Sequence, residues 1–224
     1  LVARTQLVAP GRMPEPPAAD GGAYARVAGD QAVIGTGSTR LALARQPAGW
    51  GVGVLQCRRG GWRPLALLPR LGLIVTPEGE VPVMLRAASA SGGGAAATLL
   101  LEGSLRVAGQ FWAARVALAA RAGLDLIHYE LQLTPAADSE ILAIEGPMLY
   151  AGELGGDARQ DAIVPGLEWL VDGEESSSAL DFRPEHPDRV RCVPHPYKVT
   201  VPAVGMKLGD SVLGLLWDVP GEQA

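Results

Sequence analysis

Residues 98–133 have the sequence TLLLEGSLRVAGQFWAARVALAARAGLDLIHYELQL, and this stretch decides the fold class. Near its start, Leu99, Leu101 and Leu105 share one side of an extended chain, and polar residues share the other. Near its end, Tyr129 and Leu131 alternate with polar residues in the same way. A period of two is typical of a β-strand with one buried face. The stretch therefore predicts a strand at each end.

The middle of this stretch, residues 111–123, fits two structures. Its Ala, Leu and Arg residues favour a helix, and helices often end at a glycine such as Gly123. Trp112, Val116 and Leu118 also fit a strand pattern, and the segment lies between two well-marked strands. We therefore predict a third strand in a meander.

The rest of the chain from Tyr24 onward consists of short segments separated by Gly, Pro, Asp and Ser, a spacing typical of all-β folds. We expect a loop or hairpin connection at the three glycines of residues 92–94 and another strand at 197–205. About a dozen or more strands exceed one open sheet, so we predict a large two-sheet antiparallel β-sandwich.

Residues 24–224 are predicted to form this sandwich domain, and the Pro- and Gly-rich residues 1–23 a leader or linker. No signal-peptide pattern is visible at the start. We expect a mature product or a piece of a longer protein, with an extracellular or periplasmic location slightly favoured over a cytoplasmic one. Cys57 and Cys192 either form one long-range disulfide or remain two separate thiols.

Composition argues against several classes of partner. The net charge is −5 and the basic residues are scattered, so we expect no nucleic-acid binding. No apolar run is long enough for a membrane-spanning helix, so we expect no membrane partner. The three histidines lack metal-ligand spacing, which predicts no metal site. The segments GTGSTR and GWGVGV do not match a dinucleotide fingerprint and favour turns and close strand packing, so we expect no cofactor.

The segment VPGLEWLVDGEESSS, residues 164–178, places an aromatic residue among acids. Glu168 and Asp172 frame Trp169, and Glu174 follows a predicted turn. An aromatic ring can stack on the apolar face of a sugar while carboxylates accept hydrogen bonds from its hydroxyls. The same combination also occurs in ordinary solvated loops.

His128 and Glu130 are two residues apart on one predicted strand, which places their side chains on one face about 7 Å apart. Such a pair can act as acid and base on a sugar ring. A solvated strand face explains it more simply. His195 with Glu168 is the other available pair, and 24 acidic residues in the chain do not single out a catalytic couple.

Six segments resemble a known group of proteins; they are TRLALARQPAGWGVGVLQ, GWRPLALLPRLGLIV, GPMLYAGE, VPGLEWLVDGEESSS, RVRCVPHPYKVTVPAVGM and VLGLLWD. Their order and spacing are similar to the N-terminal β-sandwich region of large, mostly uncharacterised bacterial proteins that look like glycoside hydrolases. The resemblance spans residues 24–218. It implies a galactose-mutarotase-like sandwich that is usually followed by a helical-barrel domain carrying the catalytic acids.

Three functions follow from these observations. The first is a carbohydrate-associated, non-catalytic domain whose sugar-facing surface includes Glu168, Trp169, Asp172 and Glu174, together with His195, Tyr197 and Lys198. The second is a mutarotase-type or epimerase enzyme acting on aldoses, in which a histidine and a carboxylate converge. The third is a structural or interaction module that meets a C-terminal helical barrel or another subunit. Fold alone does not choose among them.

Overall fold

The computed structural model describes residues 21–152, 159–172, 174 and 200–218. These residues form strands, turns and irregular segments without a helix, which confirms the predicted all-β class. The chain divides into two compact units, residues 1–150 and residues 151–224. The predicted single sandwich domain over residues 24–224 stays a prediction. Each unit is described by itself below.

The first unit contains thirteen strands among its described residues, the last ending one residue past the boundary. The strands are β1 (Tyr24–Ala28), β2 (Gln31–Gly35), β3 (Thr39–Gln46), β4 (Gly49–Arg58), β5 (Trp62–Arg70), β6 (Leu73–Thr76), β7 (Gly79–Pro82), β8 (Ala87–Gly93), β9 (Ala96–Val107), β10 (Gln110–Arg121), β11 (Ile127–Pro135), β12 (Ala143–Glu145) and β13 (Met148–Ala151).

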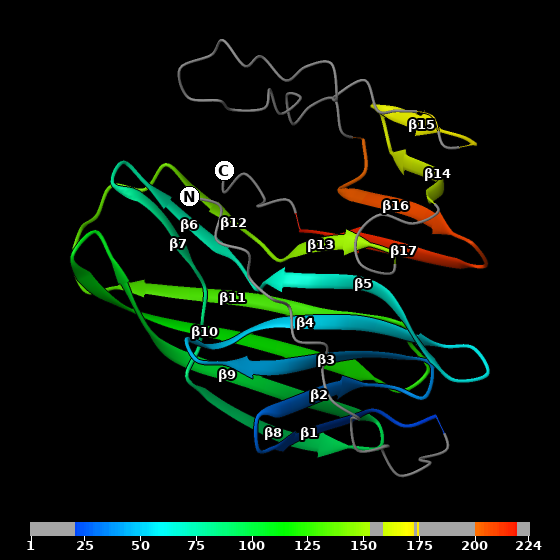
Figure 1. The fold of residues 1–224 in the computed structure, drawn as a ribbon, viewed down its shortest axis with the longest axis horizontal. Coiled ribbons are helices and arrows are strands. Elements are labelled where there is room, and N and C mark those ends of the chain that lie inside the picture. The colour runs from blue at the N-terminus through cyan, green and yellow to red at the C-terminus, as the bar shows by residue number, and fades with distance from the viewer. Residues whose placement is uncertain (1–20, 153–158, 173, 175–199, 219–224) are drawn as a thin grey trace, which may run out of the picture. The chain divides into compact units, whose positions relative to one another are not determined.

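Two large sheets of the first unit pack face to face. One has the order β1-β2-β3-β4-β5-β13, and the other has the order β11-β10-β9-β8. In Figure 1 the blue-to-cyan strands of the first sheet lie in front of the green strands of the second. The first unit also contains a three-stranded sheet with the order β12-β6-β7. Every pairing with a determined register is antiparallel, as expected for a sandwich.

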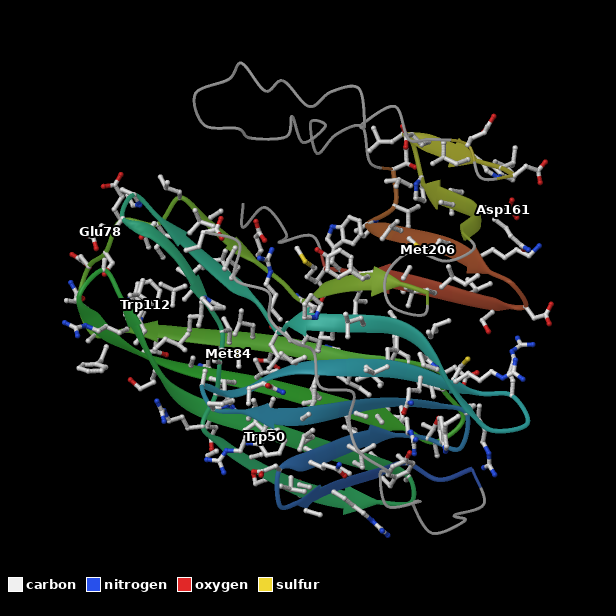
Figure 2. All side chains as sticks on the ribbon, viewed as in Figure 1. Trp50, Glu78, Met84, Trp112, Asp161 and Met206 are labelled. Atoms are coloured by element: carbon white, nitrogen blue, oxygen red, sulfur yellow. The ribbon has the colours of Figure 1, made fainter. Side chains whose placement is uncertain are left out.

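The core lies between these sheets and follows the alternation in the sequence. Ile34 and Leu43 of the six-stranded sheet are fully buried, as are Leu99 and Leu101 of the four-stranded sheet. Trp50 is also in this core, and Figure 2 labels it. The apolar set on one face of each strand therefore packs against the apolar set of the facing sheet.

The middle segment of residues 98–133 forms β10, as predicted. Trp112, Val116 and Leu118 are buried, and the alternate residues between them are more exposed. β10 pairs along its whole length with β9 on one side and along most of it with β11 on the other. Packing of its alternating apolar residues thus outweighs the helix propensity of its Ala, Leu and Arg residues.

Two predicted boundaries require correction. Gly92 and Gly93 of the predicted connection belong to strand β8, because they pair in register with β9, and the connection consists of residues 94 and 95. The expected strand around residues 197–205 starts later, since Thr200 to Pro202 form bends and β16 begins at Ala203. Pro202 lacks a backbone N–H, which explains a strand start just after it.

The glycines of GWGVGV allow close strand packing, as the sequence indicated. A Cβ atom on Gly51 would lie 2.1 Å from the Met84 sulfur, and one on Gly53 would lie 2.5 Å from Leu43 Cδ2. Real Cβ atoms do not approach other atoms this closely. The absence of a Cβ atom at these glycines therefore allows neighbouring residues to pack closely against β4.

The buried side chain of Arg40 connects three adjacent strands of the six-stranded sheet. Arg40 of β3 donates from Nε to Gln56 Oε1 of β4 at 2.7 Å. Its guanidinium lies 4.2 Å from the centroid of the Trp62 ring on β5. A cation over an aromatic face is attracted by the ring quadrupole, so this stacking helps to offset the cost of burying the charge.

The second unit contains one four-stranded antiparallel sheet among its described residues, with the order β15-β14-β16-β17. Its strands are β14 (Arg159–Val164), β15 (Glu168–Leu170), β16 (Ala203–Leu208) and β17 (Ser211–Leu216). β14 and β16 are far apart in the sequence but pair directly. Figure 2 shows this pairing through its labelled residues, Asp161 on β14 and Met206 on β16.

Candidate functional site

A groove of about 280 Å³ lies on one face of the second unit's sheet. The strand registers explain its construction. Trp169 of β15 lies opposite Ile163 of β14, Ile163 lies opposite Gly205 of β16, and Gly205 lies opposite Gly214 of β17. Residues paired in this way project from the same face of a sheet. The groove is lined by Asp161, Ala162, Ile163, Trp169, Gly205, Met206, Lys207 and Val212.

Trp169 forms one wall of the groove and is 75 % exposed. A large aromatic side chain is normally buried, because burial removes its apolar surface from water. Here the strand alternation points Trp169 to one face and its neighbours Glu168 and Leu170 to the other. The exposed ring leaves a flat apolar surface in a groove that Ile163 and Gly205 also line.

Asp161 and Lys207 supply the charged groups of the groove. Lys207 Nζ lies 3.9 Å from Asp161 Oδ2, and the two side chains are 50 % and 40 % exposed. An exposed pair of this kind contributes about 0–1 kcal/mol to stability. Both groups therefore remain accessible to a ligand that can replace or bridge their contact.

Asp161 lies within an irregularity of β14. The register between β14 and β16 shifts between Arg159 and Ala162, which marks a β-bulge or a related irregularity. Bulges change the direction of a side chain and are frequent next to functional sites. Asp161 Oδ1 also accepts a long hydrogen bond, 3.4 Å, from the backbone N–H of Asp172.

Asp172 and Glu174, two of the predicted binding residues, shape the turn after β15. Asp172 has a φ of +48°, a left-handed conformation that Asp tolerates better than most residues. Glu174 Oε2 accepts from the backbone N–H of Val171 at 3.1 Å, and the Glu174 N–H donates to the Val171 carbonyl at 3.0 Å. These contacts stabilise the turn. The backbone N–H of Asp172 in this turn donates the hydrogen bond to Asp161.

The predicted residues do not all come together at the groove. Trp169 lines it, and Asp172 contacts one of its carboxylates. Glu168 lies on the opposite side of β15. His195, Tyr197 and Lys198 lie outside the described residues, as does Cys192, so the predictions on them stay predictions.

His128 and Glu130 lie on β11 of the first unit, on its exposed face. The register places Ala119 opposite His128 and Ala117 opposite Glu130. Neither of the two lines the Trp169 groove. The arrangement matches the solvated strand face considered above.

Asp161 and Lys207 are the groove residues that reasoning from the sequence missed. Asp161 alternates with Ile163 in RQDAIV, which is a signal of a shared strand face. Its contact with Lys207 depends on the pairing of β14 with β16, and no local pattern reports that pairing.

Among the described residues, no group of three or more His, Cys, Asp and Glu side chains has the arrangement of a metal site. The same residues contain no helix with the length and apolarity needed to cross a membrane. No protein-family model, curated protein or solved structure matches the chain.

Proposed function

We propose that the chain is a carbohydrate-binding β-sandwich domain of a glycoside-hydrolase-like protein and that the Trp169 groove holds the sugar. The observation that carries the proposal is the 75 % exposed Trp169 in one groove with the Asp161–Lys207 pair and Gly205. A sugar ring has an apolar face that can stack on an indole and hydroxyls that can both donate and accept hydrogen bonds. The groove offers a partner for each of these features.

The size of the groove supports a small ligand. Its 280 Å³ lies just below the usual range of ligand pockets, about 300–1,000 Å³. This volume suits one or two sugar rings. A longer glycan would continue beyond the groove, across the neighbouring surface of the sheet.

The charges of the groove support binding without cleavage. Asp161 is the one carboxylate among the described residues that line it. Glycoside hydrolysis usually needs two carboxyl groups about 5–9.5 Å apart on either side of the scissile bond. We therefore assign recognition to this groove and leave cleavage to a different domain of the parent protein.

A glycan-array screen of the intact chain tests the proposal. We expect saturable binding to at least one glycan, and at least about a tenfold loss of affinity in Trp169→Ala, which corresponds to about 1.4 kcal/mol. Phe111→Ala is the matched control, because Phe111 is also a largely exposed aromatic residue but lies on β10 of the first unit. Equal binding by wild type and Trp169→Ala would contradict the proposal.

A second candidate function is docking to another protein domain. Val212 and Leu216 favour it, because both are largely exposed and lie on the same face of β17. A protein partner would cover this whole face, so Leu216→Ser would weaken its binding. A sugar in the groove depends on Trp169, and Leu216→Ser would leave its affinity unchanged.

A further inference from the structure

We infer that the groove selects uncharged sugars and that Asp161 is the residue that excludes sugars with a carboxylate. This inference rests on the proposed function and specifies the ligand class of the same groove. It makes Asp161 a specificity-determining residue.

Inside the groove, one negative and one positive group lie side by side. The 3.9 Å separation of Lys207 Nζ and Asp161 Oδ2 lets one hydroxyl accept from the ammonium and donate to the carboxylate. A sugar carboxylate can only accept. It would pair with Lys207 but would lie next to the like charge of Asp161, which repels it.

The contacts of Asp161 keep its carboxylate in the groove. Its Oδ1 accepts from the Asp172 backbone N–H, and its Oδ2 faces Lys207. Asp161→Asn keeps the size of the side chain and removes its charge, so Lys207 becomes an unopposed cation in the groove. The variant should then accept a carboxylate where the wild type rejects it.

Isothermal titration with matched sugars tests this inference. The probes are β-1,4-linked hexasaccharides of gluco, manno and galacto configuration, and the same three oxidised at C6 to the uronates. We expect wild type to bind at least one neutral hexasaccharide at least about tenfold more tightly than its uronate. In Asp161→Asn this preference should shrink at least about tenfold or reverse. Glu168→Asn, on the other side of β15, is the control and should keep the preference.

The outcomes separate the two proposals. Binding to uronates as tight as to neutral sugars, lost in Trp169→Ala, would overturn the inference on Asp161 and leave the proposed sugar-binding function in place. An unchanged preference in Asp161→Asn would also overturn the inference. No binding of any of the six probes by a chain that also binds no glycan of the array would overturn both.

Discussion

Trp169 lies directly opposite Ile163 in the register of β14 and β15, and both side chains project into one groove. Gly205 continues this row on β16. A Cβ atom on Gly205 would lie 3.6 Å from Ile163 Cγ2, which is an ordinary van der Waals contact. The groove therefore has space for a side chain at position 205. We propose that a bound sugar occupies this space.

Gly205→Val should abolish sugar binding without unfolding the protein. The valine would fill the groove beside Trp169, and β-branched residues suit strands better than glycine does. We expect a loss of affinity of at least about tenfold and a Tm equal to or above that of wild type. Titration of an array-identified glycan and a thermal unfolding scan measure the two effects. Wild-type affinity in a folded Gly205→Val variant would place the sugar elsewhere.

Tyr129→Phe should destabilise the first unit. The Tyr129 hydroxyl donates to the Leu71 carbonyl at 2.6 Å and so joins edge strand β11 to the connection between β5 and β6. Removing one such hydrogen bond costs about 1 kcal/mol. Urea unfolding measures the change, with Tyr150→Phe as the control because Tyr150 is exposed. Equal losses in the two variants would argue against a special role for the Leu71 contact.

Stability should fall in strongly alkaline solution. Burial raises the pKa of Tyr129 above its ordinary value of 10.0, and burial also raises the pKa of Tyr24. The folded state therefore keeps these protons when the unfolded chain has lost them, so stability is fully present below about pH 10 and decreases above it.

The expected slope for Tyr129 is about 1.4 kcal/mol per pH unit above pH 10. Urea unfolding at pH 9 and pH 11 measures it. Tyr129→Phe should have a smaller slope than wild type, whereas Tyr150→Phe should keep the wild-type slope. Parallel pH profiles for wild type and Tyr129→Phe would show that this phenol does not cause the alkaline loss.

Ala108→Asn should stabilise the β9–β10 hairpin. Its two-residue turn has positive φ at Ala108, +46°, and at Gly109, +78°. Such turns favour Asn-Gly, because Asn tolerates the left-handed conformation better than Ala does. We expect a gain of about 0.5–1 kcal/mol in urea unfolding. A loss in Ala108→Asn, with Phe111→Ala near neutral, would contradict this reading of the turn.

The sequence of residues 98–133 predicts three strands correctly because their alternation is local and each strand buries one face. Boundaries near Gly92 and Pro202 were wrong. Gly92 has no Cβ and therefore carries no alternation signal, yet it still pairs with Ala97. Pro202 lies inside an alternating pattern, but it has no backbone N–H to donate to a neighbouring strand, and β16 begins just after it.

The candidate site was predictable only in part, for a similar reason. Trp169 stands out in the sequence because an aromatic residue among acids is a local pattern. Asp161 and Lys207 meet through the pairing of β14 with β16, and Asp161 lies within the irregularity between Arg159 and Ala162. Register and bulges arise from tertiary packing, so neither residue could be joined to Trp169 from the sequence alone.

The most direct test of the central claim is a two-dimensional NMR titration that observes the indole N–H signals of the five tryptophans. The ligand is a glycan that binds in the array, and Trp169→Ala assigns the signal of Trp169. We predict a saturable shift of the Trp169 signal, with the signals of buried Trp50 and Trp112 unchanged. A saturable binding curve with an unmoved Trp169 signal would contradict the proposal that sugar stacks on this residue.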